Sequence, residues 1–406
     1  MYKKNFFLIT FFAFLSLFSL FKLYDHAATL ATFEYGEWLI NYQHGFVRRG
    51  LIGEIIYLFS NLFNNNIQIT FFIILAFVCL IYYFLNYIFI KDIKYNFLYS
   101  LVIFSPLFYL FFVVISKVGI RKEIIFYIFY LLYLLHLSSK NFKLNKNWKF
   151  IFIFPLLLLN HESTFFYLPY LILPLLFLVK KEDLKNLIFQ TFTLIILSSF
   201  VMLFLYAYKG TAEHTINVCQ SLGNYAPIKC DWWGPIAALR LDLLKNIEGK
   251  SLSFFYLSAN YKTWLGFLFY IFYGFISFFI YLRFVNVNYN NFIDRKKLFF
   301  LVYPAILGFS LPLFHIAEDW SRWFSIHFHL LAFLIFFLQR TKIVNFENDL
   351  KFIKINDYLI KKRKNFLFII LLLFYATSLH HHHFFFKGVK LEFTYYKIFK
   401  KIKRNF

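Results

Sequence analysis

The segment IQITFFIILAFVCLIYYFLNYIFI, residues Ile67–Ile90, carries no charged side chain. It is longer than the roughly 20 helical residues that cross the hydrocarbon core of a bilayer. Similar apolar blocks lie on both sides of it, and the best defined are Asn96–Ile115, Asn186–Tyr206 and Leu298–Phe314. The length and composition of Ile67–Ile90 predict a transmembrane helix, and the repetition predicts a chain that crosses the membrane many times.

The composition of the whole chain agrees with this prediction. Hydrophobic residues make up 61% of the 406 residues, and the mean hydropathy is +0.62. Soluble domains average about 45–50% apolar residues, so an ordinary soluble fold is excluded. We therefore predict an all-α, polytopic integral membrane protein of about 10–11 transmembrane helices, because each crossing needs roughly 20 residues. We expect residues 1–406 to form a single membrane domain whose non-cytoplasmic loops carry short interfacial helices.

Basic residues give the chain a formal net charge of +23. They are scattered through short connectors, whereas a nucleic-acid-binding protein gathers them on one face, so we predict no nucleic-acid partner. Lysine-rich connectors are typical of the cytoplasmic side of a membrane protein. Lys3 and Lys4 precede the first apolar block, and further lysine-rich connectors alternate with polar ones. This alternation predicts a cytoplasmic N-terminus, with the lipid bilayer as partner.

The same alternation assigns three connectors to the non-cytoplasmic side, residues 22–68, 207–261 and 315–323. Charged residues that remain on that side, or within the membrane, indicate a functional site. The candidate residues are the carboxylates Asp25 and Glu37, the acid–base pair His161 and Glu162, and, as ligands of substrate or phosphate, Arg48, Arg49, Lys117, Arg121, Lys122, His315, Asp319 and Arg322.

One short pair of apolar blocks separates two lysine-rich connectors. Lys149 and Lys180 both favour the cytoplasmic side, yet the residues between them are too few for two full crossings. We therefore expect Phe150–Leu159 and Ser163–Val179 to form a hairpin of short helices. Its apex, Asn160-His161-Glu162, would lie at the non-cytoplasmic surface.

The first non-cytoplasmic connector contains adjacent arginines. Arg48 and Arg49 precede the apolar stretch Leu51–Phe59, which we expect to begin a helix. A helix N-terminus beside two guanidinium groups is a site for an anion, above all phosphate. A helical spacing would also align four polar residues along one face: Glu37, Asn41, His44 and Arg48. The alternative is an interfacial helix whose arginines contact lipid headgroups.

A second concentration of charge lies in Ser116–Glu123, between two apolar blocks. Lys117, Arg121 and Lys122 place three cations at one non-cytoplasmic turn, and binding of a lipid-linked phosphate would explain them. The structural alternative is pairing with a nearby glutamate such as Glu123.

Histidines supply candidate acid–base groups. His161 and Glu162 are either a base with its orienting partner or a cap at a broken helix. His315, Asp319 and Arg322 fall within two helical turns, and two further histidines follow in an apolar block. Because these histidines show no established metal-ligand spacing, a divalent metal is not assigned and no cofactor is required.

The cysteines fit the predicted orientation. Cys79 lies inside an apolar block, where a thiol is expected to serve as packing. Cys219 and Cys230 share a non-cytoplasmic connector, and in an oxidising compartment they would form a disulfide. The alternative is two free thiols.

These residues resemble two neighbouring groups of bacterial envelope proteins. One is the GT-C superfamily of membrane glycosyltransferases, which take sugar from a polyprenyl-phosphate donor and carry an acidic residue just beyond the first helix, where Asp25 stands here. The other is the Wzy and EpsG-like polysaccharide polymerases, whose non-cytoplasmic arginines engage lipid pyrophosphate. Arg48-Arg49, the turn Gly119–Glu123 and the apex Asn160–Glu162 are similar to that pattern.

The resemblance implies a protein of the bacterial inner (plasma) membrane that performs glycosyl transfer without ATP, in assembly of cell-surface polysaccharide or glycolipid. It also implies that Asp25 and Glu37 are catalytic groups. A carboxylate would deprotonate the acceptor hydroxyl, and cations would stabilise the departing phosphate. The implied partners are a polyprenyl-phosphate lipid and a glycan acceptor. Two other classes remain as alternatives: a transporter or flippase for a lipid-linked or anionic solute, and a membrane acyltransferase centred on His161 or His315.

Overall fold

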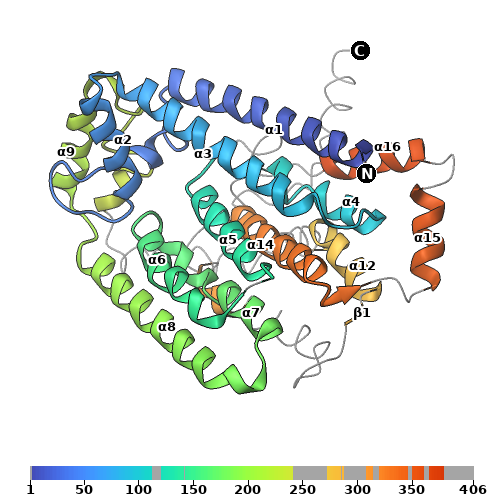
Figure 1. Ribbon diagram of the computed structural model, residues 1–406. Helices are drawn as coiled ribbons and strands as arrows, with labels where there is room; N and C mark the ends of the chain where they lie inside the picture. The colour runs from blue at the N-terminus through green and yellow to red at the C-terminus, as the bar shows by residue number, and fades with distance from the viewer. Residues whose placement is uncertain are drawn as a thin grey trace, which may run out of the picture.

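Long apolar helices dominate the computed structural model (Figure 1). It describes residues 2–111, 120–140, 142–240, 272–284, 286–287, 308–313, 320–345, 350–360 and 365–378. Four helices in this part of the chain are long and apolar enough to cross a membrane: α1 (Tyr2–Ala28), α3 (Ile67–Ile90), α8 (Leu184–Ala207) and α14 (Trp320–Arg340). The predicted all-α polytopic class is confirmed, and the chain is a membrane protein. The full number of crossings stays a prediction.

Shorter elements complete the described fold. The α-helices are α2 (Leu51–Leu62), α4 (Phe97–Ile103), α5 (Glu123–Leu137), α6 (Trp148–Leu158), α7 (Pro169–Leu178), α9 (Ala212–Leu222), α12 (Ile276–Phe284), α15 (Leu350–Ile360) and α16 (Asn365–Ser378). The 3₁₀ helices include η1 (Gly36–Leu39), η3 (Leu144–Asn147), η4 (Glu162–Tyr167) and η7 (Ala237–Arg240). A two-residue antiparallel pair joins β1 (Asn286–Val287) to β2 (Val344–Asn345). Apart from that pair, the described structure is helical.

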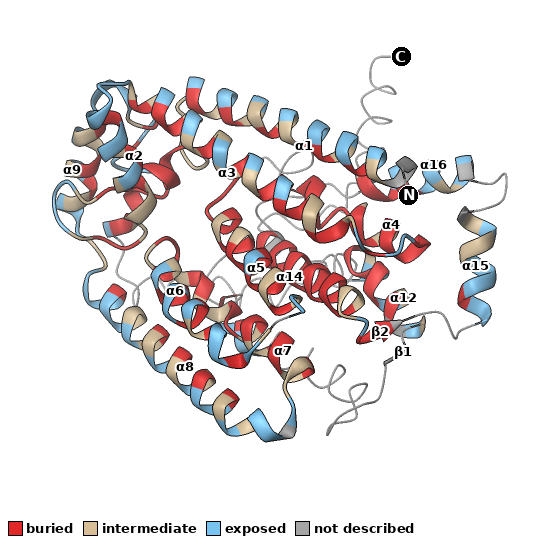
Figure 2. Ribbon diagram, in the orientation of Figure 1, coloured by how far each residue is buried: buried red, intermediate tan, exposed pale blue. Residues whose placement is uncertain are grey.

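The helices differ in which surface they bury. In α14, 94% of the apolar stretch is buried inside the protein, compared with 22% in α8. Figure 2 shows α14 buried along its length, while α1 and α8 alternate buried and exposed faces. The exposed faces carry large apolar side chains, among them Leu17 and Phe21 of α1 and Phe200 of α8. Such faces are stable against lipid tails, so α14 forms the centre of the bundle and α1 and α8 its periphery.

The predicted hairpin is present. Helix α6 ends at Leu158, the chain turns at Asn160 and His161, and η4 and α7 form the second arm of the hairpin. His161 caps η4, because its Nδ1 accepts a hydrogen bond from the Ser163 backbone N–H at 3.2 Å. The hairpin brings its apex to the end of the bundle where α2 and α9 lie, on the left of Figure 1.

The predicted block Asn96–Ile115 is not one continuous helix. Helix α4 ends at Ile103, and Ser105 and Pro106 follow it. Proline lacks a backbone N–H and disfavours helical geometry at the residue before it, so the helix ends ahead of Pro106. Residues 112–119 and most of the block Leu298–Phe314 lie outside the described residues.

Close packing of α2 against η1 generates a stability prediction. A Cβ on Gly53 would lie 1.8 Å from the Ile40 carbonyl oxygen, so Gly53→Ala must separate the two segments. We expect a loss of about 1–3 kcal/mol, as for other overpacked sites. Thermal unfolding in detergent measures it. Gly308→Ala is the matched control, because a Cβ there meets nothing within 4 Å. Equal melting temperatures for the two variants would contradict the close approach.

Candidate functional site

Charged side chains from five segments converge near the end of the bundle that holds α2 and α9. The segments are η1, the loop before α2, the residues that precede and begin α5, the hairpin apex and the start of α14. We call the set the charged cluster, and its members are Glu37, Arg48, Arg49, Arg121, Lys122, Glu123, His161, Glu162 and Arg322. Seven of these nine are buried, and Arg49 and Glu162 are partly exposed.

Glu37 lies at the centre of the charged cluster and is fully buried. Its Oε2 pairs with Nε of Arg121, and its Oε1 lies 3.5 Å from Nη2 of Arg322. Burial favours the neutral acid, but the charges of Arg121 and Arg322 outweigh it and hold the pKa of Glu37 well below its usual value. The Trp38 indole N–H donates to the Ile120 carbonyl at 3.0 Å and fixes η1 beside Arg121. Glu37 is therefore a permanent anion that organises the cations around it.

His161 faces Glu37 through its other ring nitrogen. Nδ1 accepts from the Ser163 backbone N–H, so the ring proton belongs on Nε2, which lies 3.4 Å from Glu37 Oε1. Burial and the neighbouring Arg49 lower the pKa of His161, despite the opposing effect of Glu37. The imidazole is therefore neutral near pH 7 and orients Glu37 without adding charge.

Arg49 and Glu162 form the partly exposed edge of the charged cluster. The Arg49 Nε donates to Glu162 Oε2 at 2.8 Å, and its Nη2 donates to Oε1. Arg48 Nη1 lies 3.7 Å from the same carboxylate. The side chains of Arg49 and Glu162 are 22% and 18% exposed, compared with 4% for Arg121. A ligand from outside would therefore reach Arg49 and Glu162 first.

Arg322 connects the charged cluster to the central helix. Its Nη2 pairs with Oε1 of Glu123 and also lies 3.4 Å from Nε2 of His161. Because Arg322 stands in the first turn of α14, the ion pair with Glu123 joins α14 to α5. Glu123 was the alternative partner for the cations of its own connector, but it pairs with Arg322, while Arg121 of that connector pairs with Glu37.

Lys122 acts on the backbone of Arg49. Its Nζ donates to the Arg49 carbonyl, and its own carbonyl accepts from Asn160 Nδ2 at 3.3 Å. Arg49 has a φ of +67°, a left-handed conformation uncommon for a residue with a side chain. Burial lowers the pKa of Lys122 to about 7. Lys122, predicted as a direct phosphate ligand, contacts the chain itself and holds Arg49 in its unusual conformation.

The charged cluster carries more positive than negative charge. Four arginines and Lys122 face three glutamates, so two positive charges are unmatched when Lys122 is protonated and one when it is neutral. Among the described residues, the buried Nε of Arg48 and Nη1 of Arg121 have no hydrogen-bond partner. A buried charge without a partner is costly, and a bound anion would supply both charge and acceptors. The charged cluster is therefore a candidate anion-binding site.

Some predicted site residues do not join the charged cluster. Asp25 is exposed on the last turn of α1 and makes no described ion pair with the charged cluster. Lys117, His315 and Asp319 lie outside the described residues. Glu37 and Glu162 are therefore acidic groups of this site, and Asp25 is not.

The predicted helical face in the first connector is wrong. Helix η1 ends at Leu39, and the chain to Gly50 is irregular. Asn41 Oδ1 accepts from the Gln43 backbone N–H at 3.3 Å, a local turn that competes with helix. His44 is consequently exposed, while Arg48 reaches the charged cluster by another route.

A disulfide-linked segment, α9 to η7, packs beside the charged cluster. Cys219 and Cys230 form the predicted disulfide within it. Arg48 Nη2 donates to the Ala238 carbonyl at 2.9 Å, and the Ile228 backbone N–H donates to the Leu30 carbonyl at 3.1 Å. The segment is thereby attached both to the charged cluster and to the residues that follow α1.

Comparisons of this chain with known protein families, with curated proteins and with solved structures find no match. Within the part of the chain that the structure describes, no group of three or more His, Cys, Asp or Glu residues is placed to hold a metal ion. The function is therefore inferred from the geometry of the charged cluster.

Anion binding should depend on the protonation of Lys122. The charged groups that face its amine are Glu37, Arg49, Glu162 and Arg121. As the pH rises through about 7, Lys122 loses its proton and the charged cluster loses one positive charge. We expect sulfate, which stays doubly charged, to bind about tenfold more weakly at pH 8.5 than at pH 6.5. Calorimetric titration of the purified protein measures this affinity.

Lys122→Met should bind sulfate weakly and without this pH dependence, whereas Lys185→Met, an exposed substitution in α8, should behave as the native protein. If Lys122 acts through Arg49, then Lys122→Met should add little to the effect of Arg49→Ala. Additive losses in the double variant would instead show that Lys122 contacts the anion directly.

Proposed function

We propose that this protein is a membrane glycosyltransferase or polysaccharide polymerase that uses a polyprenyl-phosphate-linked sugar. The unmatched positive charge of the buried charged cluster carries this proposal. Arginine pairs well with phosphate oxygens through its two-pronged guanidinium group. The proposal places the charged cluster on the non-cytoplasmic face of the bacterial plasma membrane, where such donors assemble cell-surface polysaccharide or glycolipid.

The position of the charged cluster supports a ligand that is anchored in lipid. The cluster lies at one end of a bundle whose outer helices expose apolar side chains along their length. The phosphate of a polyprenyl lipid lies at the same level as helix ends, because its tail stays in the hydrocarbon core. A lipid-linked phosphate could therefore reach Arg49 and Glu162 from the bilayer while its tail remains between or beside the helices.

Binding of the phosphate would change the contact between Arg49 and Glu162 at the partly exposed edge of the charged cluster. Phosphate and Glu162 compete for the guanidinium of Arg49, so binding releases a carboxylate oxygen. Burial favours the neutral form of Glu162, but the charges of Arg49 and Arg48 outweigh it and hold the pKa of Glu162 well below its usual value. Loss of the Arg49 contact raises that pKa and makes Glu162 a better base. Binding of the donor thereby prepares the group that deprotonates the acceptor.

The transfer step follows from these positions. The acceptor hydroxyl gives its proton to Glu162 while its oxygen forms a bond to the anomeric carbon. The bond between that carbon and the phosphate oxygen breaks, and the phosphate leaves with the bonding electrons. Arg48, Arg49 and Arg121 stabilise the negative charge that develops on the phosphate. Glu37 takes no proton and keeps Arg121 and Arg322 in place.

Substitutions separate these roles. Glu162→Gln should lower turnover by at least about a hundredfold, because it removes the base. Arg49→Lys should also be poorly active, since lysine does not reproduce the two-pronged contact. Surface polysaccharide made by cells that carry each variant, measured beside the amount of inserted protein, gives the result. Asp25→Asn is the control and should keep full activity. Full activity in Glu162→Gln would exclude Glu162 as the base.

The orientation of the protein in the membrane can be tested separately. Asn65 and Glu213 are exposed near the end of the bundle that holds the charged cluster, and Asn145 is exposed at the other end. In intact cells, a membrane-impermeant thiol reagent should label cysteines at positions 65 and 213 and leave a cysteine at position 145 unlabelled. Permeabilised cells should allow labelling at all three positions. Labelling of position 145 in intact cells would reverse the proposed orientation.

A further inference from the structure

A line of polar side chains runs through the apolar interior, away from the charged cluster. It lies among α5, α6, α7, α8 and α14 and includes the helical residues 308–313. We call it the polar path, and its members are Tyr167, Ser310, His327, Tyr170, Tyr130, Tyr133, Asn147 and Gln190. Seven of them are at most 1% exposed, and Asn147 is 2% exposed, like the apolar core around them. Polar residues inside a membrane bundle are costly, so a group of them arranged along the bundle points to a function.

His327 is the ionisable member of the polar path. Its Nδ1 lies 2.9 Å from the Tyr170 hydroxyl, and its Nε2 lies 2.7 Å from Oγ of Ser310. Both hydroxyls can donate or accept a hydrogen bond. A proton can therefore be added at one ring nitrogen while the other nitrogen releases one, which leaves the imidazole neutral and only its tautomer changed.

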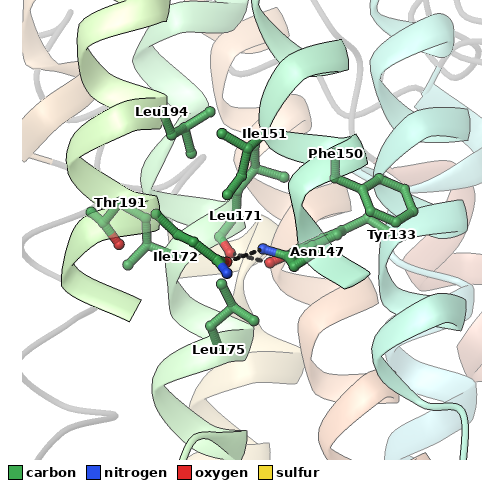
Figure 3. Close-up of a pocket in the computed structure, with 10 residues that line it drawn as sticks. Tyr133, Asn147, Phe150, Ile151, Leu171, Ile172, Leu175, Thr191 and Leu194 are labelled. Atoms are coloured by element: carbon green, nitrogen blue, oxygen red, sulfur yellow. Dashed lines mark hydrogen bonds between the residues drawn. The ribbon is translucent and has the colours of Figure 1, made fainter. Parts of the chain in front are cut away.

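The path continues toward the end of the bundle opposite the charged cluster. The ring centroid of Tyr130 lies 6.4 Å from those of Tyr170 and Tyr133, and the Tyr133 hydroxyl donates to the Leu171 carbonyl at 2.6 Å. Tyr133 then lines a pocket with Asn147, shown in Figure 3.

At that pocket the path meets amide side chains. Asn147 Nδ2 donates to Gln190 Oε1 at 3.1 Å, and Gln190 Nε2 donates to Asn186 Oδ1 at 3.2 Å. Asn186 in turn donates to Asn145 at 2.8 Å, and this last pair is exposed. Hydrogen bonds therefore link the pocket to the surface, and the rings of Tyr130 and Tyr133 lie between the pocket and Tyr170.

The other end of the path approaches the charged cluster. The ring of Tyr167 lies 5.1 Å from that of His327, and Tyr167 belongs to η4, which begins at Glu162. Along the described path, three buried polar atoms lack a hydrogen-bond partner: the hydroxyls of Tyr167 and Tyr130, and Oδ1 of Asn147. A buried group without a partner costs about 1–3 kcal/mol, and internal water relieves that cost. Water at these positions would close the gaps between the groups.

We propose that the polar path conducts protons between the charged cluster and the opposite face of the membrane, with His327 as the carrier. Each step moves a proton along hydroxyl, imidazole and water groups, and no other bond is made or broken. The inference does not rest on glycosyl transfer, although it offers an exit for a proton received by Glu162. A purely structural network would hold the same helices together without passing protons.

Proton flux through vesicles tests the proposal. The full-length protein is reconstituted into vesicles that contain a pH-sensitive dye, with the membrane voltage clamped by potassium and valinomycin, and acid is added outside. We expect the interior to acidify about tenfold faster than in protein-free vesicles. Tyr170→Phe, which keeps the ring and removes one hydroxyl, and His327→Phe should both return the rate to that of protein-free vesicles.

His329→Phe is the matched control. His329 stands two residues away on α14 and is also fully buried, but its Nδ1 bonds to the Ser325 carbonyl of its own helix at 2.8 Å. This variant should conduct as the native protein does. Equal rates in native and protein-free vesicles would overturn the proposal, as would unchanged flux in folded Tyr170→Phe. Sulfate binding by the same samples reports on the charged cluster separately, so failure of either proposal can be recognised on its own.

Discussion

The carboxylate of Glu37, buried between Arg121 and Arg322, is the interaction on which the rest of the site depends. It joins the first connector, the segment before α5 and the start of α14, and His161 adds the hairpin apex. Removing one partner of a buried ion pair typically costs about 3–5 kcal/mol, because the remaining charge is left uncompensated. Four distant parts of the chain are therefore held at one point, and the excess positive charge is built around it.

Much of the fold could be predicted from local sequence. Ile67–Ile90 is a helix with those bounds because an uninterrupted apolar block of that length has no other stable form in lipid. The hairpin followed from the spacing of Lys149 and Lys180, which limits how much chain can cross the bilayer. Arg49 and Arg121 were recognised because positive charge retained against the topological preference needs a reason, and Glu162 because it lies at the hairpin apex. The structure brings these residues together with Arg322.

The other features of the fold and site could not be predicted, because they depend on contacts between segments that are far apart in the sequence. Several carboxylates occur in the first connector, and only packing decides that Glu37 is buried and Asp25 exposed. The role of Lys122 required the positive φ of Arg49, a backbone feature with no sequence signal at a non-glycine residue. Pro106 indicates the break after α4, but the apolar block around it is long enough for a complete crossing and so suggested one helix. Polar partners inside the bundle, such as Tyr170 with His327, come from separate helices.

The late position of Arg322 in the chain has a consequence for biogenesis. A ribosome delivers Glu37, Glu123 and Glu162 to the membrane well before α14 emerges, so Glu123 waits without the guanidinium that finally pairs with it. Until α14 enters, the centre of the bundle also lacks the helix that is most deeply buried among the four long ones. The site therefore closes only when α14 inserts, after most of the chain has already entered the membrane. Insertion of α14 is therefore the late step that membrane quality control would have to monitor.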